Sequence, residues 1–253
     1  MVVASGPVRG QLLDAAQIER LRTAATEVEG WPAGSHVWGH YAEQTASGPV
    51  ICRTENVSAC SPVVSDLVEG SLREAAGGVL DEPTTAFKDK LNYKQPGGAG
   101  FRPHQDRVAY PGVERVVSIL VAIDPCTEES GCLWLAPGVD EVLPVDDRGV
   151  VRDDVAESLD WRAAPLAPGD AVLIDGLVPH YSEANSSDQP RRVLVASYAP
   201  SREGYSREQY YAARAETMMS ESTRDGRFRI STLADFAGTE VPTETFALDR
   251  CIH

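Results

Sequence analysis

The run His104-Gln105-Asp106 carries side chains that bind metal ions. Residues two apart on an extended strand point to the same side, so this imidazole and this carboxylate can hold one ion together. Two histidines and one carboxylate form the facial triad, whose open coordination positions suit Fe(II) oxygen chemistry. The run therefore predicts two of three iron ligands, and the third is expected from a distant strand.

His180 is the preferred third ligand. It follows a short apolar run and stands in the sequence PHYS. The rival histidines are His36, His40 and His253. The first two precede the region that is expected to form strands, and the last is terminal. A histidine that only fills the core or the surface is the alternative interpretation of His180.

A cation is expected near the metal if the enzyme uses 2-oxoglutarate. When this dicarboxylate chelates iron at one end, its other carboxylate needs a partner, and arginine is the best one because it forms a two-pronged charge-assisted bond. Arg191 and Arg192 open the strand after His180 and point to opposite faces, so one of them faces inward. Ser182, two residues after His180, adds a hydroxyl on the same face if the strand continues. An exposed arginine pair is the alternative.

The elements that position these residues are short strands with flanking helices. Extended runs separated by Gly, Pro and Asp indicate antiparallel sheets, and they lie at 85–94, 115–123, 132–135, 171–175 and 192–199. The apolar run 116–123 is typical of a strand that is covered on both faces. Helices are expected over 11–29, from Ser61 to Gly77-Gly78, and after Ser206, where Gln209 completes a capping box.

Residues 139–164 form an acidic insert with eight Asp or Glu side chains. A solvated loop is the plain interpretation. A lid over a binding site is the alternative, because long loops often cover such sites. The C-terminal helices are the other candidate for a lid.

Composition limits the classes of partner. The net charge of −15 repels nucleic acid and anionic membrane surfaces, and no apolar stretch approaches the roughly 20 residues of a membrane-spanning helix. Five cysteines without a C-x-x-C pair, and a start unlike a secretory signal, predict reduced thiols in a cytoplasmic protein. The length of 253 residues fits one domain, as a monomer or a homodimer.

Three blocks of sequence resemble the phytanoyl-CoA dioxygenase family of Fe(II)/2-oxoglutarate oxygenases. They are KLNYKQPGGAGFRPHQD at 90–106, ESGCLWLAPG at 129–138 and PHYSEANSSDQPRRVLVASY at 179–198. The resemblance implies a mainly β fold with flanking helices (α+β), built on a double-stranded β-helix, which is a cupin-like jelly roll. The expected single oxygenase domain 1–253 then has a helical N-terminal region 1–80, a jelly-roll core 85–200 and a helical C-terminal region 204–253.

The resemblance also implies roles for single residues. Iron would be held by His104, Asp106 and His180, with 2-oxoglutarate and O₂ as cosubstrates. A carboxylate at Asp106 argues for oxygenation, because related halogenases resemble this pattern but carry a small residue there. The expected cosubstrate contacts are Arg191, Ser182 and Asn92, and the lysines expected to line the mouth of the active site are Lys88, Lys90 and Lys94. For each lysine, a wet sheet edge that discourages aggregation is the alternative.

A basic segment beside the expected iron site points to the kind of substrate. Segment 88–107 has a net charge of +3, so the rest of the chain holds −18. A basic stretch in an acidic protein predicts a small substrate with an anionic group, such as a carboxylate, phosphate or phosphonate, bound by Lys88, Lys90, Lys94 and Arg102.

Hydroxylation of an unactivated C–H bond, in a small metabolite or a natural-product intermediate, is the expected reaction. Succinate and CO₂ would be the co-products. Desaturation or cyclisation remains open. So do an oxygenase that does not use 2-oxoglutarate and a cupin-like binding protein without turnover.

Overall fold

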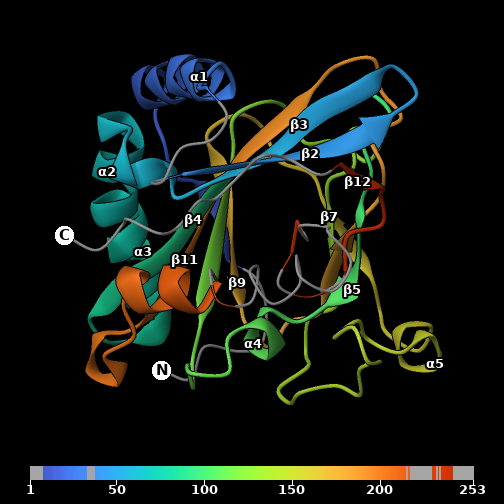
Figure 1. Cartoon of the computed structure of the whole chain (residues 1–253). Helices are drawn as coiled ribbons and strands as arrows, with labels where there is room; N and C mark the ends of the chain where they lie inside the picture. The colour runs from blue at the N-terminus through green and yellow to red at the C-terminus, as the bar shows by residue number, and fades with distance from the viewer. Residues whose placement is uncertain are drawn as a thin grey trace.

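The computed structural model describes residues 8–32, 38–214, 216, 230–231, 233 and 235–241. Within these ranges the chain forms two antiparallel sheets that face each other (Figure 1). The larger sheet has the order β1 (Val8–Gln11), β9 (Asp170–Asp175), β6 (Val117–Ala122), β11 (Arg191–Pro200), β4 (Thr84–Lys94), β3 (Gly48–Glu55), β2 (Gly39–Thr45) and β12 (Glu240–Val241). The smaller sheet has the order β5 (Phe101–His104), β10 (His180–Ser182), β7 (Leu133–Leu135) and β8 (Arg162–Ala164). The predicted double-stranded β-helix is confirmed.

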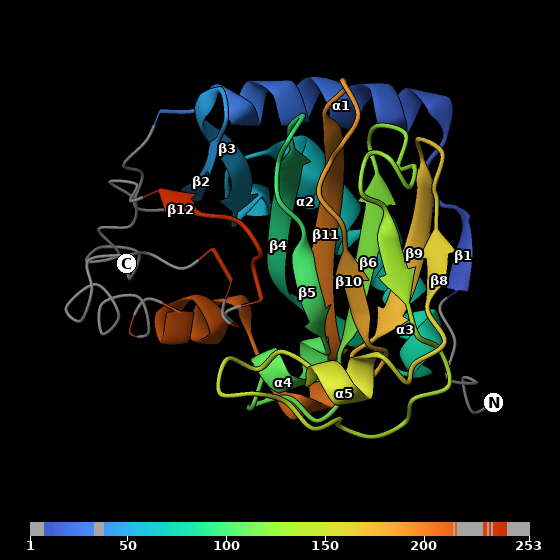
Figure 2. The same ribbon diagram turned by 90° about the vertical axis from the view of Figure 1, so that its right-hand side faces the viewer.

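Strand β6 is buried along its whole length, as its apolar sequence predicts. Ile119 and Val121 pack in the cluster that includes the N-terminal helices. Leu120 and Ala122 point the other way, into a cluster shared with the smaller sheet. The sandwich therefore buries both faces of its central strands, and Figure 2 shows β5, β10 and β8 in front of the larger sheet.

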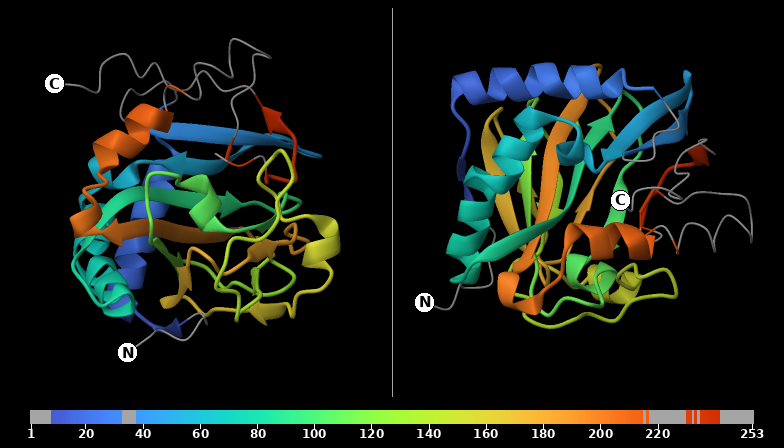
Figure 3. Two further views of the ribbon diagram at one scale, coloured as in Figure 1. Left: turned by 90° about the horizontal axis from the view of Figure 1, so that it is seen from below. Right: turned by 60° about the vertical axis from the view of Figure 1, so that its left-hand side comes forward.

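Three helices cover the outer face of the larger sheet: α1 (Ala15–Glu29), α2 (Pro62–Glu69) and α3 (Ser71–Leu80) (Figure 3). Helix α1 begins at a capping box in which the Asp14 carboxylate accepts from Gln17 N at 2.8 Å. Helix α2 begins at the N-cap Ser61, as expected. The expected single helix from Ser61 is in fact two, which meet at Gly70, and the second continues through Gly77 and Gly78.

The expectation that the N-terminal region 1–80 is helical must be corrected, because strands β2 and β3 form a hairpin there and β3 pairs with β4. The inward positions of β3 are polar: Arg53 is 2% exposed and Glu55 is 1% exposed. A strand that buries charged residues lacks the apolar alternation by which strands are predicted.

The C-terminal region is also only partly helical. A helix covers 207–214 and begins at the predicted capping box, in which Ser206 N donates to Gln209 Oε1 at 2.8 Å. The described residues of 230–241, here called the C-terminal strap, then run beside β5 and β2 (Figure 1). Arg102 N donates to Asp235 O at 2.7 Å, and Ala237 N donates to Gly100 O at 3.0 Å. The strap thus closes one side of the space between the sheets.

The remaining short helices are η1 (Val57–Ala59), α4 (Asp106–Ala109), α5 (Asp153–Ala156) and η2 (Ser201–Glu203). Helix α5 and strand β8 lie in the acidic insert, which is therefore not a plain loop. In the described ranges, no helix is both long enough and apolar enough to cross a membrane.

Candidate active site

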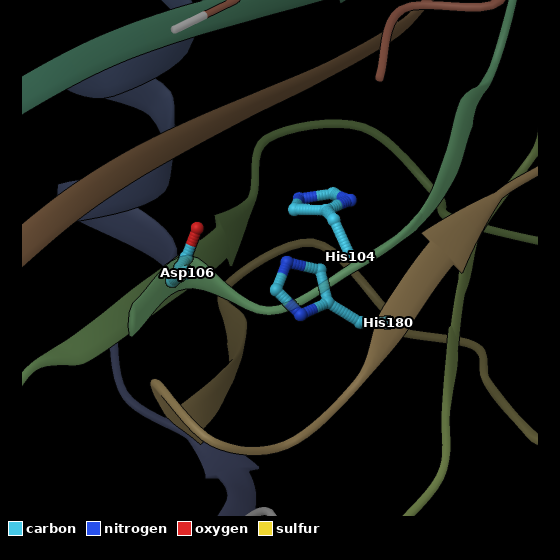
Figure 4. A group of neighbouring side chains, drawn as sticks. All are labelled: His104, Asp106 and His180. Atoms are coloured by element: carbon cyan, nitrogen blue, oxygen red, sulfur yellow. The ribbon is translucent and has the colours of Figure 1, made fainter. Parts of the chain in front are cut away.

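The three predicted metal ligands lie together between the sheets. His104 ends β5 and is paired with His180, the first residue of β10. The two ring centroids are 4.3 Å apart. Asp106 opens α4 directly after β5, and one ligand atom from each of the three residues lies within 4.8 Å of the others. Figure 4 shows the three side chains pointing toward a common space.

The residue between the two adjacent ligands fixes their relative direction. Gln105 has extended backbone angles, φ −119° and ψ 129°, so the two-residue alternation continues beyond β5 to Asp106 as predicted. The Gln105 side chain points away from the ligands and is buried. It donates to the carbonyl oxygens of Leu177 and Glu141, and accepts from Leu143 N at 2.8 Å. The acidic insert thus supports the metal loop from behind and contributes no side chain to the cavity wall.

Both histidines have the tautomer that metal binding requires. His104 Nδ1 lies 2.7 Å from Arg102 O, and His180 Nδ1 lies 3.0 Å from Val178 O. A carbonyl oxygen only accepts, so Nδ1 carries the proton in each ring and Nε2 keeps its lone pair for a metal. The rival His40 is buried and engaged with Thr54 and Trp31, whereas His36 and His253 lie outside the described residues.

The charge states of the ligands also fit a divalent metal. Burial opposes ionisation of Asp106, but His180, His104, Lys90 and the Ser118 hydroxyl outweigh it and lower its pKa to about 2. Burial, and then the neighbouring His104, lower the pKa of His180 to about 4. At neutral pH the cluster offers an ionised carboxylate and a neutral imidazole. A two-histidine, one-carboxylate set of this kind matches Fe(II).

One end of the cavity beside the triad is lined by Arg191, Ser182 and Lys94. Arg191 is buried, its Nη2 donates to Gly131 O at 2.6 Å, and its Nε has no hydrogen-bond partner among the described residues. Lys94 Nζ donates to Ser182 Oγ at 2.9 Å and to Gly131 O at 3.3 Å. Arg192 points away and pairs with Asp124 at 2.7 Å. Arg191 is thus the inward-facing arginine, and Lys94 lies beside it rather than with the other two lysines.

The other end carries Lys88, Lys90 and Arg53. Arg53 Nε donates to Asn92 Oδ1 at 3.0 Å, and its Nη1 lies 3.4 Å from Glu55 Oε1. Lys88 Nζ lies 3.3 Å from the Tyr110 hydroxyl and 3.9 Å from Glu55 Oε1. Asn92 therefore binds Arg53, and whether it also contacts a cosubstrate remains a prediction.

Lys90 differs from its neighbours because its ammonium group has no hydrogen bond or ion pair with any side chain in the described part of the chain. Burial, followed by the positive charges of Arg53 and Lys88, holds the pKa of Lys90 well below the usual lysine range. A group of positive charges without enough carboxylates to balance it is suited to binding an anion.

The fourth residue predicted to bind substrate, Arg102, is exposed and lies outside this cavity. Sequence reasoning missed Arg53 and Asp235, which do line it. Arg53 stands two residues before Glu55 and opposite Asn92, and this alternation of charges was the available signal. Asp235 comes from the strap, far along the chain from His104, and no motif marks it.

Comparison of the sequence with known proteins identifies the family of this chain. The model of the phytanoyl-CoA dioxygenase family matches residues 7–193. The chain belongs to this family. It is 35% identical to the methylphosphonate hydroxylase of Gimesia maris over 90% of this chain and 89% of that protein. It is 33% identical to the 2-aminoethylphosphonate dioxygenase of an uncultured bacterium over 84% of each chain.

Solved structures of the phytanoyl-CoA dioxygenase fold superpose on the described chain. AviO1 from Streptomyces viridochromogenes matches with a TM-score of 0.65 and 25% identity over 78% of this chain and 90% of its own. EctD from S. alaskensis, solved with 2-oxoglutarate and 5-hydroxyectoine, shares the fold with a TM-score of 0.64 and 20% identity over 78% of this chain and 72% of its own. The chain is an Fe(II)- and 2-oxoglutarate-dependent dioxygenase.

Proposed function

We propose that this dioxygenase hydroxylates a C–H bond of a small alkylphosphonate. His104, Asp106 and His180 hold the iron. Arg191 and Ser182, assisted by Lys94, bind the distal carboxylate of 2-oxoglutarate. Arg53, Lys88 and Lys90 bind the phosphonate. The names of the two relatives in the previous section give methylphosphonate and 2-aminoethylphosphonate as their substrates.

The observation that carries the proposal is the presence of two separate groups of cations in one cavity. Lys88 and Lys94 both lie on β4, six residues apart, which corresponds to about 20 Å along a strand. Arg191 pairs with Lys94 in the sheet register and therefore lies too far along the sheet to neutralise the same anion as Lys88. A cosubstrate with one distal carboxylate occupies only the first, so the second is available for an anionic substrate.

A phosphonate suits the second group because of its charge. A phosphonate dianion presents three acceptor oxygens, and both arginine and lysine bind such oxyanions through charge-assisted hydrogen bonds. The pKa of Lys90 is lowered, so its ammonium form is less stable in the free cavity than that of an ordinary lysine. A dianion bound there would offset the repulsion from Arg53 and Lys88 and raise the pKa of Lys90, which favours the charged lysine.

The bound iron, together with 2-oxoglutarate and O₂, supplies the oxidant for hydroxylation and yields succinate and CO₂. The chain positions the substrate and excludes water. Apolar side chains of Leu120, Leu133 and Ile174 share the cavity wall with the ligands and limit access of solvent. The backbone acceptors at both histidine Nδ1 atoms keep the imidazoles oriented.

The decisive experiment measures succinate formation by the iron-loaded enzyme with 2-oxoglutarate and each of methylphosphonate, ethylphosphonate and 2-aminoethylphosphonate. Propionate, in which a carboxylate replaces the phosphonate of ethylphosphonate, is the matched control. We expect at least one phosphonate to stimulate succinate formation and to gain one oxygen atom. If no phosphonate does so, while 2-oxoglutarate still gives the visible charge-transfer band with Fe(II), the phosphonate proposal fails and the assignment as a 2-oxoglutarate-dependent oxygenase is retained.

A further inference from the structure

One carboxylate in the cavity wall, that of Asp235, is buried and has an oxygen to which no described group donates a hydrogen bond. Asp235 is 1% exposed, and within the described part of the chain its Oδ1 has no hydrogen-bond partner. Its Oδ2 lies 3.1 Å from His104 Nδ1, but that ring nitrogen makes its hydrogen bond with Arg102 O at 2.7 Å. Buried polar atoms in folded proteins almost always have partners, so an orphaned carboxylate oxygen in a cavity calls for a donor on a ligand.

The position of Asp235 is fixed by the backbone on both sides of it. Its own carbonyl accepts from Arg102 N, and Phe236 forms an antiparallel bridge with Phe101 of β5. Arg53 also donates to Ile230 O, which ties the start of the strap to the cation group. The carboxylate is therefore held at the cavity by the fold.

The other carboxylate in the cavity wall, apart from Asp106, has its own partner. Glu43 is buried, and its Oε2 accepts from Ala99 N at 2.9 Å. Among the described carboxylates of the wall, Asp235 is the one with a fully buried oxygen that lacks a hydrogen-bond partner.

Lys90 presents the complementary feature, a cation without a protein partner in the described residues. Lys90 and Asp235 line the same cavity yet form no ion pair within 4.0 Å. Lys90 extends from β4 of the larger sheet, while Asp235 lies beside β5 of the smaller one. Lys90 lies near enough to Asp106 to lower its pKa, and Asp235 lies 3.1 Å from His104, so each of the two charges neighbours a different proposed metal ligand in the same cavity.

We propose that Asp235 binds a cationic group of the substrate and that the preferred substrate is a zwitterionic aminoalkylphosphonate. Its ammonium group donates to Asp235 Oδ1, and its phosphonate lies on Arg53, Lys88 and Lys90. The carbons between the two charged ends then lie across the metal centre, where hydroxylation takes place. This inference rests on the proposed phosphonate function and adds the residue that selects among phosphonates.

Asp235 also contacts His104, so the test must separate recognition of the substrate from support of a metal ligand. The probes are 2-aminoethylphosphonate and propylphosphonate, which differ in that a methyl group replaces the ammonium group. The quantity to measure is the ratio of their kcat/KM values with the iron-loaded enzyme. This ratio does not depend on the fraction of enzyme that is folded or loaded with iron.

We expect the wild-type protein to prefer 2-aminoethylphosphonate by about 10- to 100-fold, the range for a charge-assisted hydrogen bond. In Asp235→Asn, which keeps the shape and removes the charge, the ratio should fall toward one. Asp235→Glu should keep part of the preference. Asp147→Asn, on the exposed acidic insert, is the matched control and should leave the ratio unchanged.

An equal wild-type use of the two compounds, or a ratio that Asp235→Asn leaves unchanged, overturns the inference while the phosphonate function stands. The second outcome would assign Asp235 to holding His104 alone. If neither compound stimulates succinate formation, the proposed phosphonate function fails, and the inference fails with it.

Discussion

The two ends of the cavity hold their cations in different ways. At the Arg191 end, Arg191 and Lys94 share the backbone carbonyl of Gly131. At the Lys88 end, Arg53 and Lys88 contact side chains, namely those of Glu55, Asn92 and Tyr110. Lys90 has no partner among the described residues. A backbone carbonyl is the same for any residue type, so the first end depends less on residue identity, although Lys94 also donates to the Ser182 hydroxyl. The second end depends on residue identity, and substitutions there can change the substrate without changing the fold.

Removal of the metal centre should abolish the function of both ends. His180→Ala removes one of the three ligands, and we expect loss of tight Fe(II) binding and of detectable turnover. Anaerobic titration with Fe(II) and 2-oxoglutarate should show the visible charge-transfer band in wild type and not in the variant. A variant that keeps the band would mean that His180 is not a ligand.

Arg191→Ala should separate the two ends most sharply. The loss of a buried charge-assisted contact is expected to raise the KM for 2-oxoglutarate by about 10- to 100-fold. The KM for the phosphonate, measured at saturating 2-oxoglutarate, should change far less. An exposed cation, Arg148→Ala in the acidic insert, is the control. A 2-oxoglutarate KM that stays at the wild-type value would exclude Arg191 as the anchor.

Two lysines of the same strand allow a direct test of the comparison. Lys90→Met should raise the phosphonate KM by about tenfold, which corresponds to the loss of one charge-assisted hydrogen bond. Lys94→Met should raise the 2-oxoglutarate KM by a similar factor. Steady-state kinetics with the phosphonate and 2-oxoglutarate varied in turn would give two KM values for each of the two variants. If both variants affected the same compound, the division of the cavity into two ends would be wrong.

The pH dependence should distinguish Lys90 from a permanently charged anchor. Because its pKa is lowered, Lys90 loses its proton at a lower pH than an ordinary lysine. The advantage of wild type over Lys90→Met in kcat/KM for the phosphonate should therefore be largest at low pH and decline as pH rises through the lowered pKa, before an ordinary lysine would lose its proton. The comparison cancels the ionisation of the substrate itself, and kcat/KM reports the free enzyme. An advantage that stays constant up to the ordinary lysine range would contradict this account.

Local patterns were enough to predict that His104, Asp106 and His180 meet between the sheets. The alternation in His104-Gln105-Asp106 and the strand after His180 fix which side chains share a face, and the structure brings them together. The choice between Arg191 and Arg192 needed only the resemblance to the family. The predicted directions of these side chains are confirmed because they depend on strand periodicity, which acts over a few residues.

The remaining features depend on contacts between distant segments. Lys94 shares a face with Lys88 and Lys90, but its neighbours come from the Gly131 loop, whose position the sequence does not reveal. Strand β3 buries Arg53 and therefore lacks an apolar signal. Asp235 reaches His104 only through the pairing of the strap with β5.

The strap also has a consequence for how the enzyme is made. The proposed metal ligands and the proposed anchor Arg191 all precede the strap in the chain, and the family match ends at residue 193. During synthesis, the residues proposed to hold iron are therefore made before the segment that carries Asp235. Under the proposed role of Asp235, selection among substrates requires the strap to dock on β5.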